Sequence, residues 1–274
     1  LAAPDKRVRE IMTAEPVTVP EEMDREIVSG MFSNHQYMAL PVVDAEGHMK
    51  GIVTYDDIVD VVEKEATEDM QKIGGMQALD APYFKTGFLS MLKARAGWLT
   101  VLFIGEMFTA TAMASYEDEI SRAVVLALFI PLIISSGGNS GSQASTLIIR
   151  SLAVREIRLR DWWRVLMREL ASGLALGACL GVLGLLRVVL AEHFFPDTFG
   201  GADHSVLLGV TVAVSLMGVV VWGTLSRAML PFLVRKLNLD PATASAPMVA
   251  TIVDVTGLVI YFSVASLLLS GTLL

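Results

Sequence analysis

The feature that most constrains this chain is a series of long apolar runs that begins near Gly97 and continues to the C-terminus. A helix needs about 20 mostly apolar residues to cross the hydrocarbon core of a bilayer. Five stretches meet this requirement: residues 97–115, 121–148, 165–191, 205–234 and 243–272. Because lipid offers no partners for backbone polar groups, such runs must fold as helices. The sequence therefore predicts a mainly α membrane protein with five transmembrane helices.

The first 95 residues differ from the rest because they hold most of the acidic side chains. The whole chain is 53% hydrophobic and 18% charged, whereas soluble domains are about a quarter charged. A formal net charge of −8 argues against nucleic-acid binding, which needs a basic surface. The single cysteine, Cys179, cannot form an internal disulfide. We expect three parts: a soluble α/β module at 1–62, an acidic connecting helix and juxtamembrane segment at 63–95, and a transmembrane pore domain at 96–274.

The distribution of Lys and Arg predicts the orientation, since short cytoplasmic loops are enriched in both. The link between the second and third spans carries Arg150, Arg155, Arg158, Arg160 and Arg164. Basic residues also precede the first span and follow the fourth, whereas the loops at 116–120 and 192–204 are acidic or neutral. We therefore expect a multi-pass protein of the cell inner membrane, with the soluble module and N-terminus in the cytoplasm and the C-terminus outside.

Asp254 lies inside the fifth apolar run. A carboxylate near the middle of a bilayer costs about 2.5–3.5 kcal/mol on insertion scales and usually marks a functional site. It shares one helical face with Ala246, Ala250 and Gly257, so the face is narrow and small-sided apart from one carboxylate. The alternative is a structural Asp that bonds to the hydroxyl of Thr251 or Thr256.

Other polar residues interrupt the apolar runs. Glu106 in the first span either lines an ion path or pairs with Arg187 or another polar side chain. The string SSGGNSGSQAS at 135–145 breaks the second span; it either brings oxygens such as that of Asn139 to an ion or forms a Gly-rich kink. Glycines at 173, 177 and 181 in the third span favour close helix packing.

One carboxylate per subunit is too few to enclose a dehydrated ion but enough for hydrated Mg²⁺, which is usually held by one or two carboxylates. In a twofold homodimer, two copies of Asp254 would meet at the axis. Two like charges close together require a dication between them or the protonation of one. This reasoning favours Mg²⁺ over monovalent ions.

Residues 4–62 show one α/β pattern: a strand at 16–19, a helix at 24–32, buried strands at 40–44 and 51–54, and a helix from Asp56. The motif LPVVD followed by GIVT-x-x-D resembles a cystathionine-β-synthase (CBS) repeat. Such repeats work in pairs, and only one is found, so we expect a partial CBS pair. The resemblance implies that Thr54 and Asp57 could hold the ribose of a nucleotide such as ATP; a sheet cap without a ligand is the alternative.

The helix that leaves this module is strongly acidic over residues 56–69. Such a run is usually a solvated face, but like charges three or four residues apart destabilise a helix. Divalent cations would relieve this repulsion, so the helix could dock at high Mg²⁺ and move away at low Mg²⁺. That is a two-state element biased by ion binding, as a switch requires.

Four segments together resemble the MgtE family of magnesium channels: EATED (65–69), PLIISSGGNSGSQASTLIIR (131–150), RDWWR (160–164) and DPATASAPMVATIVDVTGL (240–258). The resemblance covers essentially the whole chain. It implies a homodimer with five spans per subunit, a pore on the twofold axis, and a connecting plug helix that closes the pore when Mg²⁺ is plentiful.

The resemblance also implies roles for individual residues. Asp254 becomes the pore carboxylate, with the Ala250 backbone near the ion path, and Ala246 stands where the family pattern has Asn. The acidic positions of the plug–membrane interface correspond to Glu65, Glu68, Asp69 and Asp240. The acidic positions that share regulatory Mg²⁺ in the CBS module correspond to Asp57, Asp60 and Glu26.

Other functions fit less well, and we do not expect an enzyme. An intramembrane serine protease would need a base hydrogen-bonded to Ser140, yet all four histidines lie outside the spans. A zinc-dependent membrane protease would need a His-Glu-x-x-His motif, which is missing. The alternative that remains is a CBS-gated transporter of another divalent cation, such as Co²⁺ or Mn²⁺.

Overall fold

The computed structural model describes residues 6–7, 10–79, 81–154, 156–194, 202–244 and 246–272, without the side chains of residues 34, 202–204 and 246–249. The chain forms two compact units, Leu1–Asp69 and Met70–Leu274. Each unit has its own hydrophobic core. The part of the predicted neutral loop at 195–201 lies outside the described residues.

The N-terminal unit is a small α/β module. Its strands are β1 (Val19–Pro20), β2 (Ala39–Val43) and β3 (Met49–Thr54), with helix α1 (Arg25–His35) between β1 and β2 and helix α2 (Tyr55–Ile73) after β3. β1 pairs with β2 in parallel, and β2 pairs with β3 antiparallel, with Leu40 opposite Val53. The order of strands and helices predicted from the sequence is confirmed, and the pattern is consistent with a CBS repeat.

Local residues fix the boundaries of this module. The side chain of Asp24 caps α1 by accepting a hydrogen bond from the Glu26 N–H at 2.8 Å, and Gln36 ends the helix with φ of 54°. One face of α1 buries Val28 and Phe32 against Leu40 of β2 and Ile58 of α2. Burial of these apolar side chains stabilises the unit and fixes where α2 leaves the sheet.

The C-terminal unit is helical. It contains α3 (Phe88–Ala114), α4 (Glu117–Arg122), the 3₁₀ turn η2 (Val124–Phe129), α5 (Ile130–Ala153), α6 (Trp162–Phe194), α7 (Ala202–Lys236) and α8 (Ala246–Leu269). Short 3₁₀ turns precede α6 and α8. Among the described residues, five helical segments are long and apolar enough to cross a membrane. The predicted number of spans is therefore confirmed.

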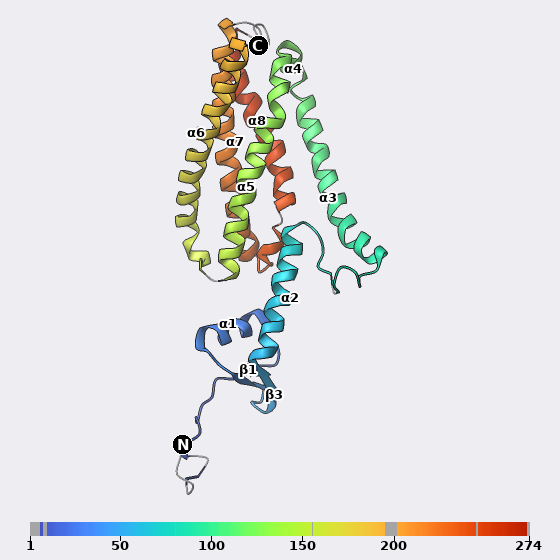
Figure 1. Cartoon of the computed structure of the whole chain (residues 1–274), viewed down its shortest axis with the longest axis vertical. Coiled ribbons are helices and arrows are strands. Elements are labelled where there is room, and N and C mark those ends of the chain that lie inside the picture. Colours follow the sequence, from blue (N-terminus) through green and yellow to red (C-terminus); the bar gives the residue numbers. More distant parts are fainter. Residues whose placement is uncertain are drawn as a thin grey trace. The chain divides into compact units, whose positions relative to one another are not determined.

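Helices α5, α7 and α8 form the centre of the helical unit, with α6 packed on α7 and α3 packed on α8 (Figure 1). The core between them includes Ile133, Leu216 and Leu258, all at most 1% exposed. The Tyr261 hydroxyl donates a hydrogen bond to the Leu126 carbonyl at 2.9 Å, which fixes α8 against η2. The middle of α8 therefore faces α5 and α7, and that is where Asp254 lies.

Glycine allows the closest approach between helices. A side chain at Gly177 would meet the Met217 backbone at 2.9 Å, and one at Gly181 would meet the Ala213 carbonyl at 2.9 Å. The glycine repeat of the third span is thus a packing surface for α7, as the sequence predicted. Gly223 of α7 faces the backbone of Gly137 in α5, where an added Cβ would lie 3.0 Å from the Gly137 carbonyl carbon.

The expected break at 135–145 is wrong. α5 is a continuous helix from Ile130 to Ala153 and includes this whole string. Its glycines at 137 and 141 let α7 approach, and several of its hydroxyls bond within α5 or across to α7; for example, Ser140 lies 2.9 Å from the Thr224 hydroxyl. The residues of this string that face α7 therefore serve helix packing without interrupting the helix.

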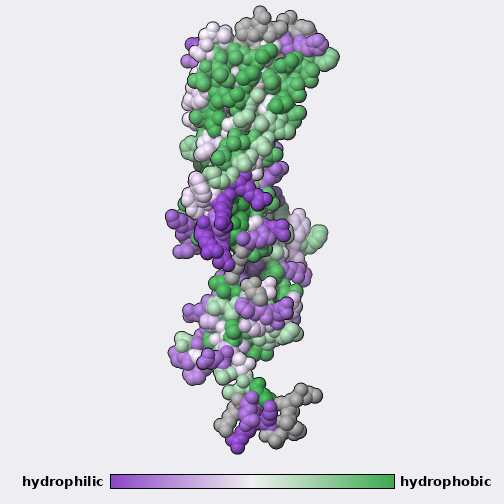
Figure 2. All heavy atoms as spheres, turned by 90° about the vertical axis from the view of Figure 1, so that its left-hand side faces the viewer, coloured by the Kyte–Doolittle hydropathy of each residue, from purple (hydrophilic) through white to green (hydrophobic). Residues whose placement is uncertain are grey.

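The outer surface of the helical unit is apolar. α3 exposes Phe103, Met107 and Phe108, each more than half exposed. Figure 2, which views the molecule from the α6 side, shows hydrophobic side chains spread over this face of the helices. A contiguous apolar surface of this size is typical of a protein in contact with lipid or another subunit.

Candidate functional site

Asp254 lies near the middle of α8, half-buried, beside the face that packs on α5 and α7. Its neighbours Val253 and Leu258 are fully buried, whereas Ile252 and Val259 are exposed. Asp254 therefore lies between two faces of α8: the face that packs on α5 and α7, and the exposed face that carries Ile252 and Val259, called the open side below. A carboxylate in this position is within reach of side chains from neighbouring helices and of anything that occupies the open side.

Glu106 of α3 is one of these neighbours. A Cβ at Gly105 would lie 2.6 Å from the Thr251 methyl group, so glycine at this position lets α3 contact α8 closely. Glu106 follows directly and is exposed, and its carboxylate acts electrostatically on that of Asp254. Arg187, the other partner considered for Glu106, lies instead on α6, which packs on α7.

Arg227 of α7 is the neighbour that the sequence analysis missed. Its side chain is 0% exposed. It donates one hydrogen bond, from Nη1 to the Ser142 hydroxyl of α5, and it interacts electrostatically with Asp254. The sequence itself contains the signal that could have identified Arg227, because an arginine inside an apolar span is treated as a functional candidate by default. Asp254, Glu106 and Arg227 are called the charged centre below.

The hydroxyls proposed as alternative partners of Asp254 have other contacts. The Thr256 hydroxyl accepts a hydrogen bond from the Trp222 indole at 2.7 Å and donates one to the Ile252 carbonyl at 2.7 Å. Thr251 contacts Gly105 of α3 as described above. The structure thus provides Thr256 with partners that do not involve Asp254.

The other predicted lining residues occupy different surroundings. Ala250 is half-buried one turn before Asp254, and the side chain of Ala246 lies outside the described residues. Gly257 is buried against Val219 of α7. Asn139 of α5 is exposed and donates to the Ser135 hydroxyl at 3.3 Å. Their roles along an ion path stay predictions.

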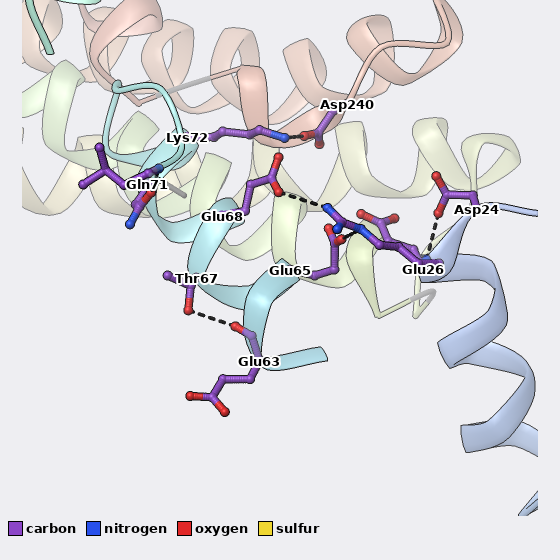
Figure 3. Close-up of polar contacts among 11 residues, drawn as sticks. Asp24, Glu26, Glu63, Glu65, Thr67, Glu68, Gln71, Lys72 and Asp240 are labelled. Atoms are coloured by element: carbon purple, nitrogen blue, oxygen red, sulfur yellow. Dashed lines mark hydrogen bonds and ion pairs between the residues drawn. The ribbon is translucent and has the colours of Figure 1, made fainter. Parts of the chain in front are cut away.

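The acidic face of α2 is partly neutralised within the N-terminal unit. Arg25 of α1 forms ion pairs with Glu65 and with Glu68, the latter at 3.3 Å (Figure 3). The Glu65 side chain is 17% exposed and that of Arg25 is 59% exposed. Asp69 is half-buried one residue further along. Two of the carboxylates assigned to the plug thus have a basic partner from the same unit.

A second ion pair lies within the helical unit. Lys72, near the end of α2, contacts the Asp240 carboxylate at 2.7 Å (Figure 3). Asp240 also accepts a hydrogen bond from the Ala242 N–H at 2.9 Å and so caps the 3₁₀ turn that precedes α8. The last turn of α2 is therefore connected by charge to the start of the helix that carries Asp254.

The remaining candidates lie on the surface of the N-terminal unit. Asp57 accepts hydrogen bonds from the Thr54 hydroxyl at 2.7 Å and the Thr54 N–H at 3.0 Å, and these bonds lower the pKa of Asp57. The pair closes the turn between β3 and α2, which agrees with the capping alternative. Asp60 and Glu26 are both exposed. Nucleotide and metal binding at these positions stay predictions.

Comparison with known proteins finds a matching domain in each unit of the chain. Residues 130–264 match the MgtE family of divalent cation transporters, and residues 8–64 match the CBS domain. The chain is 43% identical to the magnesium transporter MgtE of Thermus thermophilus over 271 residues, which is 99% of this chain and 58% of that protein. It is 32% identical to the same-named protein of Enterococcus faecalis over 96% of this chain and 55% of the relative, and 30% identical to that of Bacillus subtilis over 97% and 56%.

The five-helix domain that holds the charged centre, joined to a CBS module, has the architecture of a multi-pass membrane protein, and residues 130–264 carry a domain of divalent cation transporters. The chain belongs to the MgtE family. The predicted resemblance is confirmed. The chain spans a little over half the length of the relatives that it matches.

Proposed function

We propose that this chain conducts Mg²⁺ across the cell membrane and that its cytoplasmic acidic residues close the path when Mg²⁺ is plentiful. The observation that supports this most strongly is the half-buried Asp254 in a span of a chain whose relatives are named magnesium transporters. A mid-span carboxylate is costly and marks a functional site by default, and the Thr256 hydroxyl forms its hydrogen bonds with other groups. The alternative cargo is another divalent cation, such as Co²⁺ or Mn²⁺.

The proposed path follows the open side of α8. Asp254 and the Ala250 backbone contact the hydrated ion, and Ala246, Gly257, Asn139 and Glu106 line the route. The chain acts as a homodimer, so that two Asp254 carboxylates share one ion at the twofold axis. The exposed apolar surface of α3 and the half-exposed position of Asp254 support an arrangement in which a second subunit covers this side. Crosslinking in lipid that trapped only monomers would count against it.

The proposed gate uses the acidic residues of α2 and the loop before α8. Mg²⁺ bound at Glu65, Glu68, Asp69 and Asp240, and at Asp57, Asp60 and Glu26 of the CBS module, holds the path closed. The Arg25 and Lys72 ion pairs support the idea that these carboxylates attract cations. Since Lys72 contacts Asp240 at the entrance to α8, a shift of α2 can reach the pore helix. ATP at Thr54 and Asp57 is a further proposed ligand.

The proposed orientation places the CBS module and the basic loops in the cytoplasm of the cell and the C-terminus outside, in the inner membrane where two are present. The exposed Arg150, Arg158, Arg160 and Arg164 around the link between α5 and α6 support it. The positive-inside rule assigns such a link to the cytoplasmic side.

The proposed pore is tested by ion flux into liposomes that contain the 274-residue chain and a Mg²⁺-sensitive dye. We expect Asp254→Ala to lose nearly all flux and Asp254→Asn to be severely impaired, because the amide lacks the charge that holds the dication. Glu169→Gln on α6 removes a carboxylate outside the charged centre and should conduct normally. Normal flux through Asp254→Ala would refute the pore assignment, and faster Co²⁺ or Mn²⁺ entry would favour the alternative cargo.

The proposed gate is tested in the same liposomes by raising Mg²⁺ on the CBS side. Glu68→Gln combined with Asp69→Asn should weaken closure and shift it to higher Mg²⁺. Asp56→Asn combined with Glu63→Gln removes the same charge from the same helix at exposed positions and serves as the control. Unchanged closure in the first variant would show that α2 does not act as the plug.

A further inference from the structure

The proposed pore does not by itself explain why the guanidinium of Arg227 is buried. A guanidinium that is 0% exposed carries a large desolvation cost unless an opposite charge and hydrogen bonds compensate it. Among the described residues, Nε and Nη2 have no hydrogen-bond acceptor. Its hydrogen bond to Ser142 joins it to a neutral hydroxyl. The compensation must therefore come from a nearby negative charge.

The side chain cannot avoid this cost by reaching the membrane surface. Arg227 precedes the last residue of α7, Lys236, by nine positions, which is roughly 14 Å of helix at 1.5 Å per residue. The space for the side chain is also built into α5. A Cβ at Gly141 would lie 3.0 Å from the Arg227 Cγ, so glycine at this position leaves room for the stem of the arginine. The guanidinium is thus held in a defined place between α5 and α7.

The charge that compensates it is the candidate pore carboxylate. Asp254 is the acidic group that acts electrostatically on Arg227, and Arg227 and Glu106 act on Asp254 with opposite sign. The charged centre therefore contains two carboxylates and one fixed guanidinium in each subunit. A dication that approaches Asp254 is attracted by one neighbour and repelled by the other.

We propose that Arg227 sets the affinity of the Asp254 site: its fixed positive charge weakens divalent cation binding there, so that an ion that enters can also leave. The inference rests on the proposed function, because it takes Asp254 as an ion site. Conduction needs binding that is favourable enough for entry yet weak enough for release. Glu106 acts in the opposite direction and strengthens binding.

The test compares Arg227→Met, which keeps the length of the stem without the charge, with Arg227→Lys, which keeps the charge without the planar donors. The initial rate of Mg²⁺ entry into liposomes is measured against external Mg²⁺ for the 274-residue chain. We expect the half-saturating Mg²⁺ concentration to fall about tenfold or more in Arg227→Met, because the repulsion of a divalent ion by a nearby unit charge in partly buried surroundings has at least this effect. Arg227→Lys should stay near the wild type, and Glu106→Gln should raise the concentration.

Binding is measured separately from flux as the rise in thermal unfolding midpoint of detergent-solubilised protein on titration with Mg²⁺. The midpoint response of Arg227→Met should saturate at lower Mg²⁺ than that of the wild type or Arg227→Lys. If Arg227→Met and Arg227→Lys lose stability equally and both keep the wild-type half-saturation, Arg227 is a packing residue and the inference is wrong. If the wild type shows an Asp254-dependent midpoint response but no flux, the proposed function fails while the Arg227 comparison still decides the inference.

Discussion

Arg25 and Arg227 interact with carboxylates of the proposed sites, one arginine in each unit. Arg25 of the N-terminal unit pairs with Glu65 and Glu68, and its side chain is 59% exposed. Arg227 of the helical unit interacts with Asp254 from a site that is 0% exposed. The two guanidinium groups thus lie in surroundings of very different polarity, whereas the carboxylates of both units are partly buried.

The difference in burial decides how strongly each arrangement should matter. Water and salt screen charges at a surface, so exposed ion pairs contribute about 0–1 kcal/mol. Loss of one partner of a buried pair leaves an uncompensated charge and costs about 3–5 kcal/mol. The surface pairs can therefore be exchanged readily for a dissolved cation, as a sensor needs. The buried charges can instead tune a permanent site.

The largest effect expected from this comparison concerns folding of the helical unit. Asp254→Ala should lower the unfolding free energy by about 3 kcal/mol, the lower end of the range for a buried pair, because the buried Arg227 loses a nearby counter-charge with which it forms no direct ion pair. The double variant Asp254→Ala with Arg227→Met should recover most of the loss while conducting no Mg²⁺. Unfolding midpoints in detergent measure the stability, and the liposome assay measures the flux.

Glu65→Ala is the matched variant in the N-terminal unit. It should lower the stability of the chain by only about 0–1 kcal/mol, and the loss should shrink at high salt. Equal losses in Asp254→Ala and Glu65→Ala would contradict the distinction drawn between the two arginines.

The next largest effect is expected at the contact between α5 and α7, where Arg227 is buried. Gly223→Val should destabilise the helical unit by about 1–3 kcal/mol or more, because the added side chain meets the Gly137 backbone, which cannot move aside. Gly138→Ala in the facing helix is the control, since the nearest atom to the new methyl is 3.9 Å away. A stable Gly223→Val protein in the same detergent assay would show that the α5–α7 contact is looser than described.

Much of this architecture follows from sequence periodicity alone. Five apolar runs predicted the five helices, and the glycine repeat at 173, 177 and 181 predicted the contact of α6 with another helix. Asp254 was identified because an acid in an apolar run is costly wherever the helix packs. These features are local, so they do not depend on knowing which helix lies beside which.

The features that the sequence did not predict depend on neighbours. The string at 135–145 is helical because α7 packs on Gly137 and Gly141 and bonds Ser140, and nothing within α5 identifies that partner. Arg227 was overlooked because the fourth run is apolar enough to mask one charge, and its relation to Asp254 exists only once α5, α7 and α8 pack. The partners of Glu65 and Asp240 are distant in sequence for the same reason.

A smaller effect is expected from the surface arginine on gating. Arg25→Ala removes the arginine that competes with Mg²⁺ for Glu65 and Glu68, so closure should occur at lower Mg²⁺, by about two- to fivefold, which corresponds to an ion pair of about 0.4–1 kcal/mol. Flux into liposomes is measured while Mg²⁺ on the CBS side is varied. Lys50→Ala removes a surface cation that pairs with Asp44 instead, and it should leave closure unchanged. A shift in the opposite direction for Arg25→Ala would mean that the arginine itself holds the closed state.

The smallest effect concerns pH and the start of α2. The pKa of Asp57 is lowered by its hydrogen bonds from Thr54, so the folded unit favours the charged carboxylate more than the unfolded chain does. This contribution is fully present above the ordinary value of 3.8 and is lost as pH falls through the lower, folded pKa. Protection of the first turn of α2 from hydrogen exchange, corrected for intrinsic rates, should therefore fall below about pH 4 in the wild type. Asp57→Asn should show reduced protection at neutral pH and lose this acid step, whereas Asp56→Asn should keep it. An acid step that survives in Asp57→Asn would assign it to another carboxylate.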